Sequence, residues 1–203
     1  MTMTKVVTGA SMSLDGYVSG PDFSGFDLLF QWYERGDVVV ETADPELTFR
    51  LTKVSSTYWH RLIAETGALV VGRTLFDYVE GWGGRHPMDV PVVLLSHSVP
   101  DGWPRADAPF HFVTEGGIER AVAVARDLAG DKNVVLNSGT IASQALEAGL
   151  LDEVCVDLVP VLLGSGTPFF STPAGAPYTL DGPLSVAEGD RVTHLRYRVR
   201  YGE

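Results

Sequence analysis

Short apolar runs alternate with segments of helical periodicity along the chain. The clearest helix spans 118–129, where apolar residues recur at helical spacing and Gly130 follows the last of them. The segment 45–66 also has a helical pattern, a helix is expected to begin at Arg73, and a short one to end near Leu146. Strands are expected at Lys5–Met12, Ala68–Gly72, Val90–Leu95, Phe110–Thr114, Val134–Leu136, Val154–Leu163 and Leu195–Tyr201.

Strands that feed helices through short turns predict an α/β protein with a largely parallel sheet, in which ligands bind at the carboxyl ends of the strands. No linker-like stretch divides the 203 residues, of which 45% are hydrophobic and 20% charged. That composition is typical of a soluble globular protein. We therefore expect a single domain over residues 1–203.

Charge and composition exclude several classes of function. The formal net charge of −11 argues against nucleic-acid binding, which depends on Lys and Arg neutralising phosphates. Cys155 is the single cysteine, so no intramolecular disulfide can form. No apolar run reaches the roughly 18 residues of a membrane span. We expect a cytoplasmic protein with no membrane partner.

Several common sites have no sequence signature. The chain contains neither a GxGxxG fingerprint nor a GxxxxGK[ST] loop. Ser138 lacks the preceding glycine of a nucleophile elbow, and the five histidines are spread without metal-ligand spacing. Hydrolase and metal-dependent functions are therefore disfavoured, and no metal site is expected.

Three expected strand ends are rich in small residues: Gly72-Arg73-Thr74, Ser96-His97-Ser98 and Asn137-Ser138-Gly139-Thr140. Each can bring backbone N–H groups or a helix N-terminus to a phosphate, and three together suit a dinucleotide. Taken singly, each is a weak signal that helix capping alone explains better.

The order of these corners resembles that of the riboflavin-synthesis reductases (the RibD C-terminal-domain type) and their dihydrofolate-reductase relatives. The resembling stretches are SLDGYVSG, VVGRTLFDYVEGW, VVLLSHS, NSGTIASQAL and AGLLDEVCVDLVPVLLGSGTPFF. The resemblance covers essentially the whole chain. It implies a three-layer α/β/α fold with a mixed, mostly parallel sheet of about eight strands. It also implies NADPH-dependent reduction of a small heteroaromatic, pterin-like or ribosylaminopyrimidine-like substrate.

The same resemblance assigns residues to the cofactor. Ala10 and Val18 would flank the nicotinamide, and Arg73 would pair with the adenosine 2'-phosphate. The other implied cofactor contacts are Gly72 and Thr74 at the phosphates, Ser96, His97 and Ser98 at the adenosine, and Ser138, Gly139, Thr140 and Ile141 at the pyrophosphate.

The implied substrate residues are Tyr17, Trp32, Trp82, Arg85 and His86. Trp82 could stack on a ring and Arg85 could meet an anionic group, or Trp82 could be a packing residue and Arg85 the partner of a nearby carboxylate. Asp15, in the loop beside the nicotinamide, is the candidate proton donor, and its alternative role is that of an Asp-Gly turn residue.

Two features leave alternatives open. Relatives usually carry Gly-Gly where this chain has Asn137-Ser138, which motivates a second hypothesis of a non-catalytic nucleotide-binding or sensor protein on the same fold. The aromatic segment Phe23–Tyr33 could be a lid over a ligand or a dimer interface. By resemblance a homodimer is expected.

Overall fold

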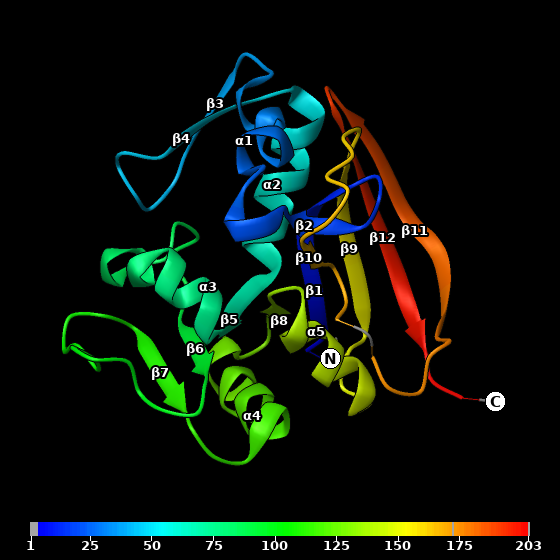
Figure 1. The fold of residues 1–203 in the computed structure, drawn as a ribbon. Helices are drawn as coiled ribbons and strands as arrows, with labels where there is room; N and C mark the ends of the chain where they lie inside the picture. Colours follow the sequence, from blue (N-terminus) through cyan, green and yellow to red (C-terminus); the bar gives the residue numbers. More distant parts are fainter. Residues whose placement is uncertain (1–3, 172, 203) are drawn as a thin grey trace.

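The computed structural model describes residues 4–171 and 173–202. An eight-stranded sheet forms its centre, in the order β11-β12-β9-β1-β8-β5-β6-β7 (Figure 1). Its strands are β1 (Val6–Ser13), β5 (Thr66–Gly72), β6 (Val92–Leu95), β7 (Phe110–Val113), β8 (Asn133–Leu136), β9 (Glu153–Val159), β11 (Thr179–Gly189) and β12 (Val192–Arg200).

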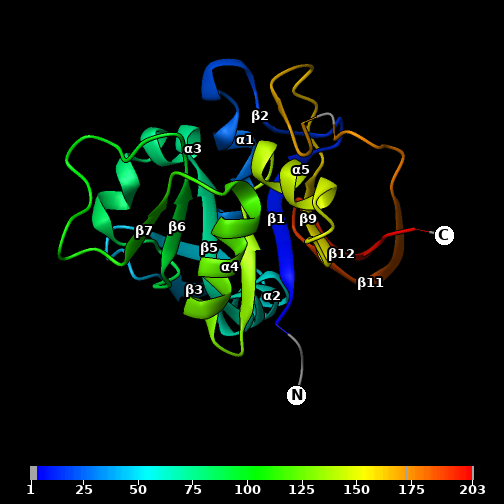
Figure 2. The same cartoon turned by 90° about the horizontal axis from the view of Figure 1, so that it is seen from below.

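The sheet is mixed and mostly parallel. All neighbours from β9 through β1, β8, β5 and β6 to β7 are parallel, whereas β12 is antiparallel to both β9 and β11. Figure 2 shows these strands spread across the molecule from β7 on the left to β11 on the right. The expected fold class is confirmed.

Helices and small sheets complete the fold. The two smaller sheets pair β2 (Tyr17–Ser19) with β10 (Thr167–Pro168) and β3 (Val38–Glu41) with β4 (Thr48–Leu51). The helices are α1 (Phe26–Leu29), α2 (Lys53–Glu65), α3 (Arg73–Tyr78), α4 (Gly117–Ala129) and α5 (Thr140–Glu147), with 3-10 turns η1 (Pro21–Phe23), η2 (Gln31–Glu34) and η3 (Glu80–Gly84).

Strand β5 shows why the sheet is covered on both faces. Its residues Ala68 and Val70 pack in the core formed with α4 and α5, whereas Leu69 and Val71 pack with Phe76 of α3. Successive side chains of a strand point to opposite faces, so a continuous apolar run requires a helical layer on each side. The expected three-layer arrangement follows directly from this run.

The expected helix over 45–66 is wrong in its first part. Residues Thr48–Leu51 form β4, in which Phe49 and Leu51 are buried and their neighbours exposed. The helix begins at Lys53, after Thr52, whose side chain accepts a hydrogen bond from the Ser55 backbone N–H at 3.1 Å. Pairing with β3 therefore overrides the helical pattern before the cap.

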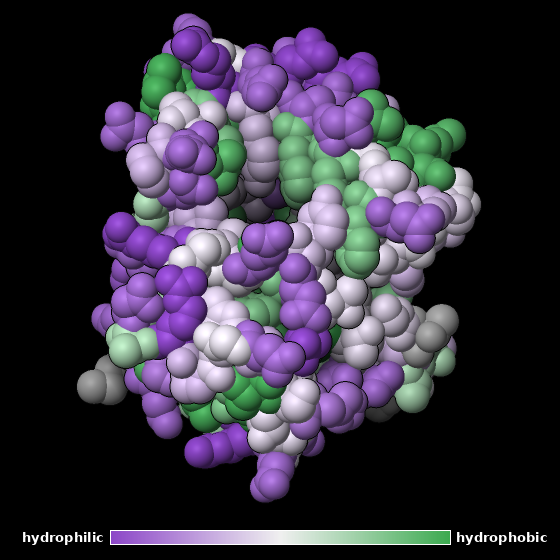
Figure 3. Space-filling view, turned by 60° about the vertical axis from the view of Figure 1, so that its left-hand side comes forward, coloured by the Kyte–Doolittle hydropathy of each residue, from purple (hydrophilic) through white to green (hydrophobic). Residues whose placement is uncertain are grey.

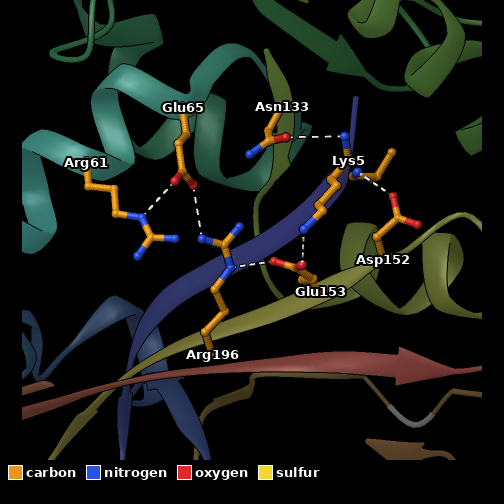
Figure 4. A network of polar contacts seen from close by, with 8 residues as sticks. Lys5, Arg61, Glu65, Asn133, Asp152, Glu153 and Arg196 are labelled. Atoms are coloured by element: carbon orange, nitrogen blue, oxygen red, sulfur yellow. Dashed lines mark hydrogen bonds and ion pairs between the residues drawn. The ribbon is translucent and has the colours of Figure 1, made fainter. Parts of the chain in front are cut away.

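The amino ends of β1, β8 and β9 are joined by a network of polar contacts (Figure 4). Lys5 Nζ lies 2.5 Å from Glu153 Oε1, and the same carboxylate contacts Arg196. Arg196 also pairs with Glu65 at 3.0 Å. The network anchors the sheet at the end opposite the strand carboxyl termini.

No helix in residues 4–171 and 173–202 is both long and apolar enough to cross a membrane.

Candidate functional site

A cavity of about 1020 Å³ lies at the carboxyl ends of the central parallel strands. Gly72 at the end of β5, Leu95 at the end of β6 and Leu136 at the end of β8 all line it. Figure 3 shows a hollow on one face of the molecule with hydrophobic side chains along part of its rim. Its size is at the upper end for small-molecule sites, which gives room for more than one ligand.

The cavity brings together every residue that the sequence resemblance assigned to the cofactor. These residues come from five separate parts of the chain, and none lies outside the lining. They are Ala10, Val18, Gly72, Arg73, Thr74, Ser96, His97, Ser98, Ser138, Gly139, Thr140 and Ile141.

Three helices begin at the cavity with glycine at the N-cap. Gly72 precedes α3, Gly116 precedes α4 and Gly139 precedes α5, and in the described structure none of these helices has a side-chain cap. The first N–H groups of a helix have no partner inside the helix, so they attract anions. One wall of the cavity therefore offers donors suited to phosphate groups.

The Asn137-Ser138 pair occupies the turn between β8 and α5. Asn137 Oδ1 accepts a hydrogen bond from the Gly72 backbone N–H at 3.0 Å, and Asn137 Nδ2 donates to the Ser138 carbonyl at 3.1 Å. The amide is thus engaged with the neighbouring strand β5. Gly139 follows at φ +74°, a conformation that favours glycine.

Arg73 is held at the cavity by a neighbour on its own helix. Its Nε donates to both carboxylate oxygens of Asp77, at 2.8 and 2.7 Å. A guanidinium carries five N–H donors, so the terminal nitrogens keep donors for a phosphate. Arg73 thus lines the cavity with guanidinium donors that Asp77 leaves unused.

Aromatic side chains form the opposite wall. Phe23, Phe26, Phe30 and Tyr33 all line the cavity. The Phe26 and Phe30 rings stack with centroids 5.5 Å apart, and Phe30 and Tyr33 at 5.3 Å. These four side chains therefore form part of the cavity wall.

Trp32 departs from its expected place at the substrate. It is fully enclosed in the core beside β3 and β4, and its indole Nε1 donates to Ser11 Oγ at 3.1 Å. It does not line the cavity, because neighbouring residues of the 3-10 turn η2 face different ways and the turn directs Tyr33 there instead.

Of the three expected substrate residues in the loop after α3, two line the cavity and one does not. Trp82 and His86 line the cavity with their rings 4.6 Å apart. Burial lowers the pKa of His86 to about 4, so its imidazole is neutral at physiological pH. Arg85 lies outside the lining and forms a two-pronged ion pair with Asp89, at 2.8 Å for each contact.

Asp15, in the β1–β2 turn, and Tyr17, the first residue of β2, lie outside the lining. The Asp15 carboxylate accepts from Ser13 Oγ at 2.6 Å and from the backbone N–H groups of Leu163 and Gly164 at 3.1 and 2.7 Å. These hydrogen bonds, the one from Ser13 first, lower the pKa of Asp15. A carboxylate held charged in this way is suited to bracing the turn and unsuited to donating a proton.

The family of the chain follows from a match that covers most of its length. The family model described as the RibD C-terminal domain matches residues 4–179. The chain belongs to the RibD C-terminal domain family. No curated protein sequence matches it closely enough to count as a relative.

Solved structures agree with this RibD C-terminal domain in fold. A protein from Shewanella sp. PV-4 assigned to riboflavin biosynthesis has a TM-score of 0.71 at 21% identity, over 98% of this chain and 100% of that one. The Thermotoga maritima diaminohydroxyphosphoribosylaminopyrimidine deaminase/5-amino-6-(5-phosphoribosylamino)uracil reductase has a TM-score of 0.59 at 13% identity, over 98% of this chain and 57% of its own length. Enterococcus faecalis dihydrofolate reductase, complexed with NADP(H) and RAB-propyl, has a TM-score of 0.54 at 13% identity, over 97% of both chains.

Sequence reasoning missed the polar residues at the inner end of the cavity in this RibD C-terminal domain. Tyr58 and Trp59 of α2 and Cys155 and Asp157 of β9 line it. Asp157 had a signal in the sequence, because it is the single charged residue within the apolar run 154–163. A charge placed in a buried strand requires a partner or a function.

Proposed function

We propose that this protein is an NADPH-dependent reductase that transfers hydride to a small heteroaromatic, pterin-like or ribosylaminopyrimidine-like substrate. One observation carries the proposal. A single cavity joins three helix N-termini that lack side-chain caps to an aromatic wall. The first part suits the phosphates of a dinucleotide, and the second suits flat rings. Membership of the RibD C-terminal domain family supports the same activity.

The residues at the strand ends fit such a cofactor. The starts of α3 and α5 offer N–H groups to the phosphates, and Arg73 offers a positive charge to the 2'-phosphate. Ala10 and Val18 also line the cavity, and their small side chains suit the nicotinamide. The cofactor, when bound, supplies the hydride, so the chain needs only to hold both partners in a dry site.

The aromatic wall assigns the other end of the cavity to the substrate. Phe26 stacks on Phe30 and Phe30 on Tyr33 along the cavity, and Trp82 and the neutral His86 also line it. Such a wall excludes water and orients a planar ring, which raises the rate of hydride transfer without an acid or a nucleophile at hand.

Arg73→Ala tests the cofactor assignment. We expect NADPH affinity, measured by quenching of tryptophan fluorescence, to fall by about 1.5 to 3 kcal/mol, the range for a charge-assisted hydrogen bond. NADH lacks the 2'-phosphate, so its affinity should hardly change. Arg85→Ala is the matched control, since Arg85 is exposed and lies outside the cavity. Equal losses for NADPH and NADH would reject the role of Arg73.

Steady-state oxidation of NADPH separates the reductase from the sensor hypothesis. We expect turnover with one member of a panel of dihydrofolate, dihydropterins and ribosylaminopyrimidines. The sensor hypothesis, which Asn137-Ser138 motivates, instead requires tight NADPH binding with no turnover in the whole panel. Failure to bind NADPH or NADP⁺ at all would reject both.

We further propose that the protein works in the cytoplasm as a homodimer. Light scattering on the eluted protein tests the dimer, and a mass of one chain would reject it. A deletion of residues 23–33 is a poor test of that interface, because the segment contributes four residues to the cavity wall.

A further inference from the structure

A buried series of hydrogen bonds leads from α2 to the inner end of the cavity. Ser55 Oγ lies 3.0 Å from His194 Nε2, and His194 Nδ1 lies 2.7 Å from Asp157 Oδ1. Ser55 and His194 are 1% and 2% exposed, and Asp157 is 9% exposed. The series has the connectivity of a Ser-His-Asp catalytic triad.

Ser55 cannot serve as a nucleophile. It is absent from the cavity lining, and a Cβ atom added at Gly189 would lie 2.4 Å from Ser55 Oγ, which shows how closely the backbone of β11 covers the hydroxyl. An acyl substrate could not reach it. The member of the series that does meet the cavity is the carboxylate, at the other end.

The packing fixes the orientation of His194. Tyr58 stacks on the imidazole with centroids 3.9 Å apart, and the edge of Trp32 meets it at 5.0 Å. Antiparallel pairing of β12 with β9 sets His194 directly opposite Asp157. A neutral imidazole with its proton on Nδ1 satisfies both contacts, because Ser55 then donates to Nε2 and Nδ1 donates to Asp157.

Asp157 keeps capacity for a ligand. A carboxylate offers about four acceptor positions, of which His194 uses one and the Tyr58 hydroxyl a second, so two remain. Among the described residues, His194 makes the one ion-pair contact recorded for Asp157, and no Lys or Arg pairs with it. Burial, followed by the charge of Asp157, raises the pKa of the Tyr58 hydroxyl, so the phenol beside the carboxylate stays neutral.

We propose that Asp157 is the substrate-binding group at the inner end of the cavity, and that Ser55 and His194 are positioning residues that hold its carboxylate. The inference rests on the proposed function and specifies its substrate class. A carboxylate among aromatic side chains selects a flat ring that presents N–H donors or a protonated nitrogen, and it repels a carboxylate or phosphate at this end. Any phosphate of the substrate must then point away from Asp157.

Benzamidine and benzoate test this selectivity on the unmodified protein, since they share a flat shape and differ in the charge of one end. We expect calorimetric titration to give about 10- to 100-fold tighter binding of benzamidine, as for a charge-assisted hydrogen bond. Equal affinities, or tighter binding of benzoate, would overturn the proposal. This comparison needs no variant and therefore does not depend on how well a variant folds.

Asp157→Asn should remove most of that preference while NADPH affinity stays within about twofold, because the proposed phosphate contacts come from the ends of β5, β6 and β8 and not from β9. Asp89→Asn is the control for loss of one acidic charge, since Asp89 is exposed and pairs with Arg85 outside the cavity. An unchanged benzamidine affinity in folded Asp157→Asn would also overturn the proposal. Loss of NADPH binding in the unmodified protein would instead reject the reductase and leave the benzamidine preference intact.

The positioning role has a spectroscopic test. We expect ¹⁵N NMR to show a proton on Nδ1 of His194, and Ser55→Ala to change the chemical shift of Nε2 and weaken benzamidine binding with NADPH affinity preserved. A Nε2-protonated tautomer in the unmodified protein would contradict the assigned direction of the hydrogen bonds. An unchanged benzamidine affinity in Ser55→Ala would exclude positioning by Ser55.

Discussion

Replacing Glu153 with Gln removes the central charge of the ion network at the amino ends of the strands (Figure 4). Glu153 is 2% exposed and contacts both Lys5 and Arg196. Loss of one member of a buried ion pair costs about 3 to 5 kcal/mol. Arg196 keeps Glu65 as a partner at 3.0 Å, and the half-exposed Lys5 can turn to water. We therefore expect the lower end of that range, about 3 kcal/mol.

The loss should appear in the free energy of unfolding, measured with urea at neutral pH. For a chain of this length, about 3 kcal/mol corresponds to a drop in Tm of roughly 6 to 12 °C. Glu65→Gln is the matched control, because this carboxylate is 34% exposed and its pairs should contribute about 1 kcal/mol or less. Equal losses in the two variants would refute the assignment of the stabilisation to the buried contacts of Glu153.

The pH dependence follows from the same contacts. Burial pushes the pKa of Glu153 upward, but hydrogen bonds and charge from Lys5 and Arg196 outweigh it and hold that pKa below the ordinary value of 4.5. The folded state thus favours the charged form. Its stabilisation is complete above pH 4.5 and is lost as the pH falls through the folded pKa. The gap between the wild type and Glu153→Gln should narrow over that window, and a constant gap would contradict the argument.

Three further predictions concern single residues. An NMR titration of His86 should give a midpoint near the pKa of about 4 set by burial, and a midpoint near 6.5 would contradict it. Because that pKa is lowered, stability from His86 falls as the pH drops from about 6.5 toward 4. Burial raises the pKa of Cys155 to about 12, so mass spectrometry should find no alkylation by iodoacetamide before unfolding. Gly36→Ala should cost about 3 kcal/mol or more, because its Cβ would lie 2.0 Å from the Leu51 carbonyl carbon, whereas Gly9→Ala, with 3.4 Å of clearance, should cost less.

The sequence predicted an element correctly wherever its residues follow a single hydrophobic period. The helix expected over 118–129 matches α4, because its apolar positions keep one period and Gly130 adopts φ +62° just after it. Strand β4 was not predictable, since its four residues sit inside a longer helical pattern and are fixed by pairing with β3. Strand β11 gave no signal, because it lies at the edge of the sheet and most of its residues are exposed.

The part of the cavity lined by strand ends was predictable for a similar reason. Its residues sit at strand ends within contiguous stretches such as Gly72-Arg73-Thr74, so the order of the chain already groups them. The inner end is assembled by packing across β12, β9 and α2. His194 and Asp157 are 37 positions apart, and Ser55 is 139 positions from His194, so no local pattern could join them.

Two helix-start glycines and the hydrogen bonds of Asn137 together explain how the cavity keeps free backbone N–H donors beside Asn137 and Ser138. Gly116 and Gly139 adopt φ +77° and +74°, conformations in which a capping Ser, Thr or Asp would be strained. The backbone N–H groups of α4 and α5 are therefore kept clear of side chains from the chain itself. The Asn137 amide is drawn to the Gly72 N–H and the Ser138 carbonyl. Asn137, although larger than glycine, thus fits at this turn because its polar atoms are hydrogen-bonded within the protein. Asn137→Gly should therefore weaken the contact between the ends of β8 and β5 more than it enlarges the cavity.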